Sequence, residues 1–271
     1  MSEAGGGGRG IARIDGSRRI HVKTTLSVIK ADVGSIGGHT RPSTRMLESV
    51  RAKVGSAIER KLVIDGMVTH TGDDIAMIMS HERGVGAGAI HKYAWEAFLD
   101  ATKEARSAGL YGAGQDLLVD APSGNIRGAG PAVAEIEFER DPGSKHRPAE
   151  AFAVFAADKC GPGAYNLPLY SVFCDPMHNG GLLLSPKMRQ GFTFVIIDMD
   201  HKGAKDDRII SLQVPEQVWD VACLLQNPDR FAVEAIYSRY KPEEQIVSVS
   251  ATRLHNIAGT YTGKDDPVAI A

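Results

Sequence analysis

Several features that would mark a specialised class of protein are scarce in this sequence of 271 residues. The three cysteines, Cys160, Cys174 and Cys223, include no CxxC pair, and their odd number is typical of free thiols in a reducing compartment. No apolar run approaches the roughly 18 residues that a membrane span needs. The formal net charge of -2 gives no basic excess that would favour nucleic acid or an anionic membrane. These absences indicate a cytoplasmic protein with no nucleic-acid partner and no membrane partner.

The composition is otherwise ordinary for a globular protein, with 43% hydrophobic and 24% charged residues. Residues 1–20 are rich in glycine and lack the apolar segment of a signal peptide, so we expect a disordered extension there. We expect residues 21–271 to form a single domain, because no linker interrupts them. The one stretch rich in proline, glycine and charge, 141–150, fits a hairpin loop between two strands.

Hydrophobic patterns predict many strands and fewer helices. Strand-like runs are rich in β-branched and aromatic residues, and several alternate in polarity as half-buried antiparallel strands do. They cover residues 23–31, 62–70, 75–81, 132–139, 151–157, 192–199, 209–214, 231–240 and 246–254. Helical stripes follow Ser43 as N-cap, occupy 91–108 before Gly109, and run from Pro215 to Leu225. The pattern predicts an α+β fold, a layered α-β-β-α sandwich of mostly antiparallel sheets flanked by helices.

Acidic or amide side chains stand at five places where predicted strands or helices stop. These places are Asp32 with the glycine-rich turn that leads to His39, Asp73-Asp74 in THTGDD, Gln115-Asp116 after the second helix, Asp158-Lys159, and Lys264-Asp265-Asp266. A single aspartate at a strand end is usually a turn former. Five such sites brought together would repel one another without cations, so the set indicates a site for several magnesium ions.

Near the C-terminus, one lysine lies directly beside two carboxylates. A lysine can form a Schiff base with a ketone, but only when its amine loses a proton. Asp265 and Asp266 would hold Lys264 in its charged form unless a metal ion neutralised them or the loop rearranged. The segment from Tyr261 to Asp266 therefore suggests two chemistries in one site.

Six sequence blocks, in order, resemble the bifunctional fructose-1,6-bisphosphate aldolase/phosphatases of archaea and deep-branching bacteria. They are VIKADVGSIGGH, THTGDD, GLYGAGQDLL, SGNIRGAGP, ADKCGPGAYNLPLY and AGTYTGKDDPV, and the resemblance runs from about Lys23 to the last residue. It implies a gluconeogenic enzyme that condenses dihydroxyacetone phosphate with glyceraldehyde 3-phosphate. The same active site then hydrolyses the 1-phosphate to give fructose 6-phosphate.

The resemblance also implies roles for individual residues. Positions that hold Mg²⁺ ions are Asp32, His39, Asp73, Asp74, Gln115, Asp158, Asp265 and Asp266. Catalytic positions are Asp32 as proton acceptor in the phosphatase step, Tyr261 as proton donor and acceptor in the aldol step, and Lys264 as the Schiff-base lysine. Substrate-binding positions are His39, Tyr111, Gly124, Asn125, Lys159, Tyr261 and Lys264. The expected partners are sugar and triose phosphates, and the expected assembly is a homo-octamer.

Family members continue well beyond the position of Asp266, so we expect this chain to lack their C-terminal portion. An inactive or scaffold fragment of the family is therefore an alternative hypothesis. A remote alternative is a nucleotidyl transferase, because a GDD sequence between two strands also occurs in template-dependent polymerases. The acidic balance of the chain and the YTGKDD segment argue against that alternative.

Overall fold

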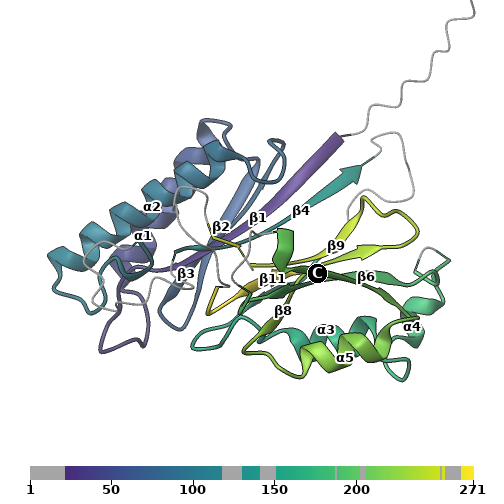
Figure 1. Cartoon of the computed structure of the whole chain (residues 1–271). Helices are drawn as coiled ribbons and strands as arrows, with labels where there is room; N and C mark the ends of the chain where they lie inside the picture. Colours follow the sequence, from purple (N-terminus) through teal and green to yellow (C-terminus); the bar gives the residue numbers. More distant parts are fainter. Residues whose placement is uncertain are drawn as a thin grey trace, which may run out of the picture.

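Two antiparallel β-sheets lie at the centre of the molecule, and helices cover the outer face of each sheet (Figure 1). The computed structural model describes residues 22–117, 130–140, 151–186, 188–201, 206–250, 252–253 and 264–271. The order of layers is helix, sheet, sheet, helix, as the sequence predicts. The α+β class is therefore confirmed.

The first sheet has five strands in the order β10-β4-β1-β3-β2. Their bounds are β1 Val22–Asp32, β2 Asp65–Thr71, β3 Asp74–His81, β4 Ala132–Arg140 and β10 Thr252–Arg253. The central strand β1 pairs with β3 and with β4, and its last residue, Asp32, lies opposite Asp74. The long strand β1 and the β2–β3 hairpin therefore end at the same edge.

Helices α1 (Thr44–Glu59) and α2 (Gly88–Ser107) pack on the outer face of this sheet. The Ser43 hydroxyl accepts a hydrogen bond from the Met46 amide at 3.3 Å, so the predicted N-cap of α1 is confirmed. Gly109, with φ of +64°, follows the end of α2 as the predicted stop. The apolar stripes of both helices and the odd-numbered side chains Ile29 and Ala31 of β1 form one core.

The second sheet has six strands in the order β5-β11-β9-β8-β6-β7. Their bounds are β5 Val154–Ala156, β6 Phe192–Asp198, β7 Ile209–Val214, β8 Phe231–Ser238, β9 Gln245–Val249 and β11 Val268–Ile270. Helices α3 (Asn166–Phe173) and α5 (Val218–Leu225) cover its outer face, with the single-turn α4 (Gly180–Leu183) nearby. Buried Phe192, Phe194 and Ile236 form the centre of that core.

A third apolar cluster lies between the two sheets. It joins Leu26 and Val28 of β1 to Val268 and Ile270 of β11. Because side chains alternate along a strand, the even-numbered side of β1 faces the second sheet. Lys30 belongs to that side and is almost completely buried. The last even-numbered residue of β1 is Asp32, so an acidic side chain stands where the core between the sheets ends.

Several sequence expectations differ from the structure. The strands β4 and β5 do not pair as the expected hairpin, since β4 lies in the first sheet and β5 in the second, and the expected loop 141–150 lies outside the described residues. The predicted strand 246–254 is divided between β9 and β10, which belong to different sheets. The third helix begins at Val218 rather than at Pro215. The pattern analysis did not predict α3, α4 or β11, because short elements carry too little periodicity to be recognised.

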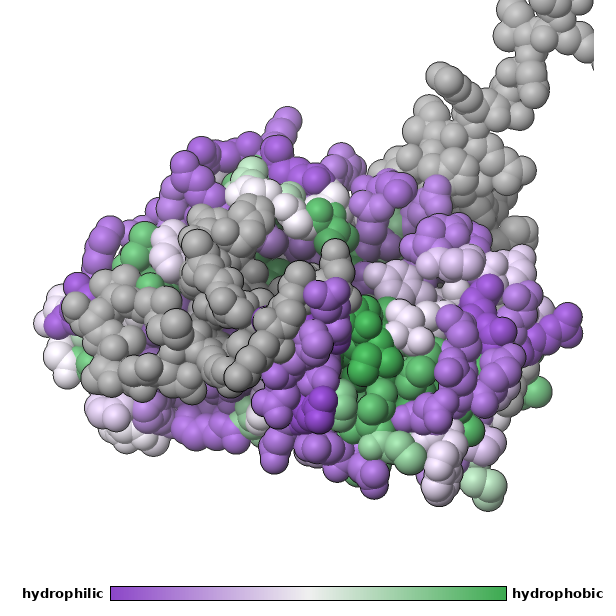
Figure 2. All heavy atoms as spheres, viewed as in Figure 1, coloured by the Kyte–Doolittle hydropathy of each residue, from purple (hydrophilic) through white to green (hydrophobic). Residues whose placement is uncertain are grey.

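The coloured part of the face seen in Figure 2 is mostly polar, with an apolar area near the C-terminal strand β11. The edge strand β5 lies beside β11, and Phe152 and Phe155 are about half exposed.

Cys160, Cys174 and Cys223 are free thiols, as expected. Among the described residues, no helix combines the length and apolar character that crossing a bilayer requires. The expected disordered extension lies outside the described residues, and the single-domain assignment stays a prediction.

Candidate active site

The candidate site lies at the edge where both sheets present the ends of strands. The first sheet contributes the end of β1, the β2–β3 turn and the short helix η1 (Gln115–Leu117). The second contributes the residues after β5 and before β11, which are neighbours because these strands are antiparallel. The Ala157 amide donates to the Pro267 carbonyl at 3.0 Å and continues this pairing beyond the strands. Four of the five places singled out in the sequence supply two acidic clusters here, and the fifth supplies Asp116, which accepts a hydrogen bond from the Asp32 amide.

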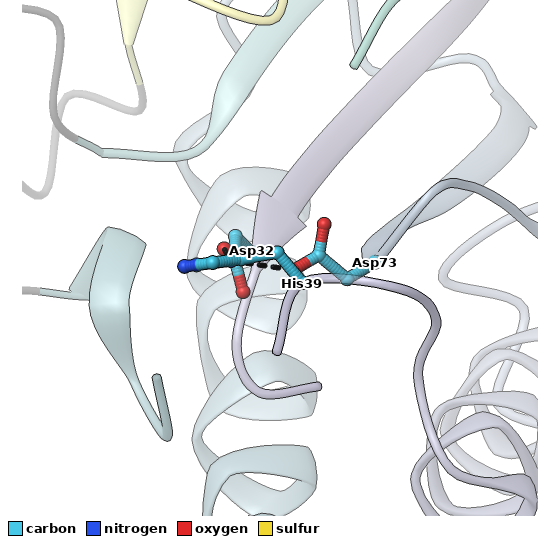
Figure 3. A group of neighbouring side chains, drawn as sticks. All are labelled: Asp32, His39 and Asp73. Atoms are coloured by element: carbon cyan, nitrogen blue, oxygen red, sulfur yellow. Dashed lines mark hydrogen bonds and ion pairs between the residues drawn. The ribbon is translucent and has the colours of Figure 1, made fainter. Parts of the chain in front are cut away.

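The first acidic group consists of Asp32, His39 and Asp73, whose candidate ligand atoms all lie within 4.8 Å of one another. Figure 3 shows the three side chains converging from the end of β1, the turn after it and the β2–β3 turn. His39 Nδ1 lies 2.7 Å from an Asp73 oxygen and 3.4 Å from an Asp32 oxygen. The turn that presents His39 is tight, and His39 itself has a φ of +57°.

Asp73 occupies a two-residue hairpin turn. Thr71 pairs with Asp74, so Gly72 and Asp73 form the loop, as the THTGDD pattern predicts. Gly72 has a φ of +54°, and a Cβ there would lie 1.7 Å from an Asp158 oxygen. Only glycine leaves room for Asp158 to approach the turn. The hairpin therefore brings two neighbouring aspartates against the acidic residue that follows β5.

The second acidic group consists of Asp74, Asp158 and Asp266, with candidate ligand atoms again within 4.8 Å of one another. The Cys160 amide donates to Asp266 Oδ1 at 2.7 Å, and the Asp266 amide donates to the Cys160 carbonyl at 2.8 Å. This reciprocal pair holds the loop after β5 against the segment before β11. Asp266 adopts a φ of +46°, so its carboxylate is fixed by a constrained backbone.

Lys159 connects the two groups. Its Nζ lies 2.9 Å from an oxygen of Asp73 and 2.9 Å from one of Asp158. Burial would raise the pKa of Asp73, but the hydrogen bonds from Lys159 and His39 outweigh burial and lower it. The lysine side chain is about half exposed, so its ammonium group is accessible to a ligand. A cation in this position can contact an incoming phosphate.

Protein cations offset only part of the burial of the other carboxylates of the site. Burial, together with the neighbouring charges of Asp73 and Asp116, raises the pKa of Asp32 to about 7. Burial is also the main cause that raises the pKa of Asp74 to about 8, and it raises that of Asp266. At neutral pH, Asp32 and Asp74 therefore take up a proton or a cation. Carboxylate oxygens crowded in this way fit a hard divalent cation, and the two acidic groups could each hold a metal ion.

Lys264 is buried behind the second acidic group. Its Nζ lies 2.7 Å from Asp265 Oδ1 and 3.5 Å from Asp116 Oδ1. Burial would lower the pKa of the Lys264 amine, but Asp116 and Asp265 outweigh burial and raise it. The conflict expected from the sequence is therefore present in the structure. The lysine is held as a cation until the charges around it change.

The structure adds two buried residues, Lys30 and Asp116, to the site residues that the resemblance implies. Lys30 Nζ forms an ion pair with Asp74 and donates to the Ala157 carbonyl at 3.0 Å. Asp116 accepts a hydrogen bond from the Asp32 amide at 2.9 Å. A lysine inside the apolar run VIKA is one signal that could have identified Lys30. Asp116 stands beside Gln115 in the sequence, but nothing there reveals that its side chain turns inward.

The remaining expected site residues have mixed outcomes. Tyr111 is exposed and its ring lies edge-on to His39, with 4.6 Å between the ring centroids. Gln115 and His39 both lie next to Gly112, where a Cβ would meet Gln115 Oε1 at 3.2 Å. Tyr111 and Gln115 therefore lie near His39, a member of the first acidic group. The other three expected positions, Gly124, Asn125 and Tyr261, lie outside the described residues.

We expect Lys30→Met to lower the free energy of unfolding of the metal-free protein by about 3–5 kcal/mol, because it leaves a buried carboxylate without its partner. Chemical denaturation in the presence of EDTA measures this change. Lys53→Met is the matched control, since Lys53 pairs with Asp100 at 2.8 Å on the partly exposed surface of α1 and α2. The control should cost no more than about 1 kcal/mol. Equal losses for the two variants would contradict the structural role of the Lys30–Asp74 pair.

Sequence comparison relates the chain to one family of known proteins. A family model described as fructose-1,6-bisphosphatase matches residues 23–271. The chain is similar to the fructose-1,6-bisphosphate aldolase/phosphatase of Thermus thermophilus, at 54% identity over 92% of this chain and 66% of that protein. It is also similar to the protein of the same name from Moorella thermoacetica, at 47% identity over 92% of this chain and 62% of that relative. The protein of the same name from Methanocaldococcus jannaschii is 42% identical over 94% of this chain and 62% of that relative. The chain thus spans slightly less than two thirds of the length of these relatives.

Proposed function

We propose that this chain, which belongs to the fructose-1,6-bisphosphatase family, carries the catalytic centre of a fructose-1,6-bisphosphate aldolase/phosphatase. The proposed reactions are the condensation of two triose phosphates and the hydrolysis of the 1-phosphate of the product. One observation supports both reactions in one site. A buried lysine, Lys264, contacts Asp116 and Asp265, and it lies two residues before Asp266, a member of the second of two acidic groups that are suited to divalent cations.

We assign Mg²⁺ to these groups, because carboxylate oxygens are its preferred protein ligands. Asp32, His39, Asp73 and Gln115 would hold metal at the first acidic group. Asp74, Asp158 and Asp266 would hold metal at the second, and Asp265, which belongs to neither group and contacts Lys264 in this structure, is assigned there by the resemblance alone. When bound, Mg²⁺ supplies charge that stabilises the phosphoryl oxygens and acidifies the attacking water.

In the phosphatase reaction, the residues of the chain would position the phosphate and remove a proton. Lys159 presents an accessible ammonium group between Asp73 and Asp158, where an anionic phosphate would replace carboxylate contacts. We assign Asp32 as the proton acceptor, since its carboxylate belongs to the first acidic group, where the apolar core between the sheets ends. Tyr111 and His39 lie edge-on to each other on the exposed side and would contact the sugar.

In the aldol reaction, the amine of Lys264 would attack the ketone carbon of dihydroxyacetone phosphate, and the carbonyl oxygen would leave as water. Tyr261 would then move a proton between carbon and solvent. Burial of Lys264 supports this assignment, because an imine survives where bulk water is excluded. Gly124 and Asn125 complete the proposed set of sugar-phosphate contacts.

The test is to measure phosphate release from fructose 1,6-bisphosphate and condensation of triose phosphates on the same preparation, with and without Mg²⁺. We expect both activities from a chain that contains the complete site, and we expect EDTA to remove phosphate release. Activity independent of divalent cations would contradict the proposal. Binding of Mg²⁺ without either activity would favour the alternative of an inactive or scaffold fragment. Among the described residues of the site, no contact supports the nucleotidyl transferase alternative.

Gly72→Ala should weaken Mg²⁺ binding, because the added Cβ cannot coexist with the Asp158 carboxylate in its present position. We expect the Mg²⁺ concentration for half-maximal thermal stabilisation to rise about tenfold or more. Gly109→Ala is the matched control, with a similar φ of +64° and no heavy atom within 4 Å of the added Cβ. Both variants should lose roughly 1–2 kcal/mol from backbone strain. Only the first should change the response to Mg²⁺, and an equal response would show that Asp158 does not need its present position.

A homo-octameric assembly and a cytoplasmic location, both expected from the sequence, are part of the proposal. Size-exclusion chromatography with light scattering would test the assembly. Fractionation of the source cells would test the location.

A further inference from the structure

Asp116 is a buried carboxylate that contacts both halves of the proposed active site. It lies in η1, and only 7% of its surface is exposed. Its Oδ2 accepts a hydrogen bond from the Asp32 amide at 2.9 Å, and its Oδ1 lies 3.5 Å from Lys264 Nζ. One side chain therefore joins the main chain at the end of β1 to the lysine that precedes β11.

Asp265 lies closer to Lys264 than Asp116 does, but its surroundings are different. The Asp265 side chain is 60% exposed, whereas that of Asp116 is 10% exposed. Water screens an exposed ion pair, while a buried one retains more of its attraction. Asp265 is also one of the proposed metal-binding positions, and a carboxylate that turns to a metal is withdrawn from the lysine. Asp116 stays oriented, because the Asp32 amide fixes its other oxygen.

The lysine attacks as a neutral amine, and the protonated imine that results again needs a negative group near its nitrogen. In forming the imine, the ammonium group gives two of its three protons to the carbonyl oxygen, which leaves as water. The nitrogen keeps one proton and the positive charge while the new C=N bond replaces the C=O bond. The total charge is unchanged, so the protonated imine needs the same partner as the ammonium did.

We propose, on the basis of the proposed aldol function, that Asp116 is a positioning residue that keeps Lys264 paired and aimed at the ketone through this step. Its contact with the Asp32 amide is a second, separable task that serves the acidic end of the site. The two tasks depend on different properties of one side chain. Pairing with the lysine requires negative charge, whereas accepting the amide hydrogen bond requires only an oxygen.

Asp116→Asn separates the two tasks. The asparagine amide keeps an oxygen that can accept the Asp32 N–H but lacks the charge that faces Lys264. Asp116→Ala removes both the oxygen and the charge. A residue that merely stabilised the fold would affect both reactions equally in each variant. A residue that pairs with Lys264 would affect the aldol step far more in the asparagine variant.

The experiment compares these variants with the wild-type protein in two measurements made at saturating Mg²⁺. One is the rate at which borohydride traps dihydroxyacetone phosphate on Lys264, read by mass spectrometry. The other is phosphate release from fructose 1,6-bisphosphate. We expect trapping by Asp116→Asn to fall on the order of 10- to 100-fold more than phosphate release, since a charged hydrogen-bond partner is lost. Asp116→Ala should lower both measurements.

The matched control is Asp100→Asn, which removes a carboxylate that contacts Lys53 and Lys103 at 2.8 Å each, on a helix outside the site. It should show no difference between the two measurements. Trapping by Asp116→Asn that is unchanged or faster than wild type, or that falls only as much as phosphate release, would overturn the inference. A wild-type protein that traps no adduct would instead overturn the proposed aldol function, and this inference with it.

Discussion

Replacing Asp73 or Asp74 with alanine should abolish release of phosphate from fructose 1,6-bisphosphate. The two neighbouring residues serve different acidic groups, because Asp73 belongs to the group with Asp32 and Asp74 to the group with Asp158. Either variant therefore damages one proposed metal position. Metal ions supply several kcal/mol of transition-state stabilisation in phosphoryl transfer, so we expect a loss of about 10³-fold or more.

Asp100→Ala is the control for this prediction, since Asp100 is a lysine-paired aspartate on α2 away from the site. It should leave phosphate release near the wild-type rate. The measurement is a phosphate assay over a range of Mg²⁺ concentrations, together with the thermal unfolding temperature of each variant. Phosphate release that survives both site substitutions, or that persists in excess EDTA, would show that the acidic groups are not the catalytic metal site.

Local sequence signals predicted the pieces of this site well. The THTGDD turn, the end of the apolar run at Asp32 and the cap at Ser43 each depend on neighbouring residues, and the structure places them as expected. Turn and capping preferences act over a few residues, so they can be recognised without knowledge of the fold. The class of the fold followed from the same short-range patterns.

The assembly of these pieces could not be predicted from residue patterns alone, because it depends on contacts between distant segments. Asp266 meets Cys160 through a pairing across 106 residues, and Lys264 meets Asp116 across 148. The strand β11 that places them has three residues, too few to show a periodic pattern. Resemblance to a family supplied what periodicity could not, since it joined six blocks into one expected site.

Lys30 illustrates a different limit. In the sequence, it is one charged residue inside an apolar run, and a lysine on a strand is usually exposed. Its burial depends on which face of β1 meets the second sheet and on the presence of Asp74 opposite the end of β1. A one-residue shift of register would turn Lys30 to the helix side, where it would have no carboxylate partner. Tertiary pairing, and not local preference, decides the role of this residue.

Lys264 should be the residue on which borohydride traps dihydroxyacetone phosphate. The lysine is buried between Asp116 and Asp265, and this acidic environment keeps it charged in the absence of ligands. Binding of Mg²⁺ to the neighbouring carboxylates would reduce that negative charge and allow the neutral amine to form. We therefore expect trapping to require Mg²⁺ as well as substrate, and peptide mapping should place the adduct on Lys264.

Lys264→Ala should abolish both the adduct and triose-phosphate condensation while retaining measurable phosphate release, because hydrolysis needs no imine. The variant leaves the buried Asp116 without its cation, so a lower unfolding temperature is expected, and retained phosphate release serves as the check that the site is still folded. Lys159→Ala is the informative comparison. Lys159 is more accessible and already lies among carboxylates, so it is the alternative amine for nonspecific trapping. An adduct that maps to Lys159, or one that persists in Lys264→Ala, would mean that Schiff-base chemistry does not occur at the buried lysine. The two reactions would then not share this site in the way we propose.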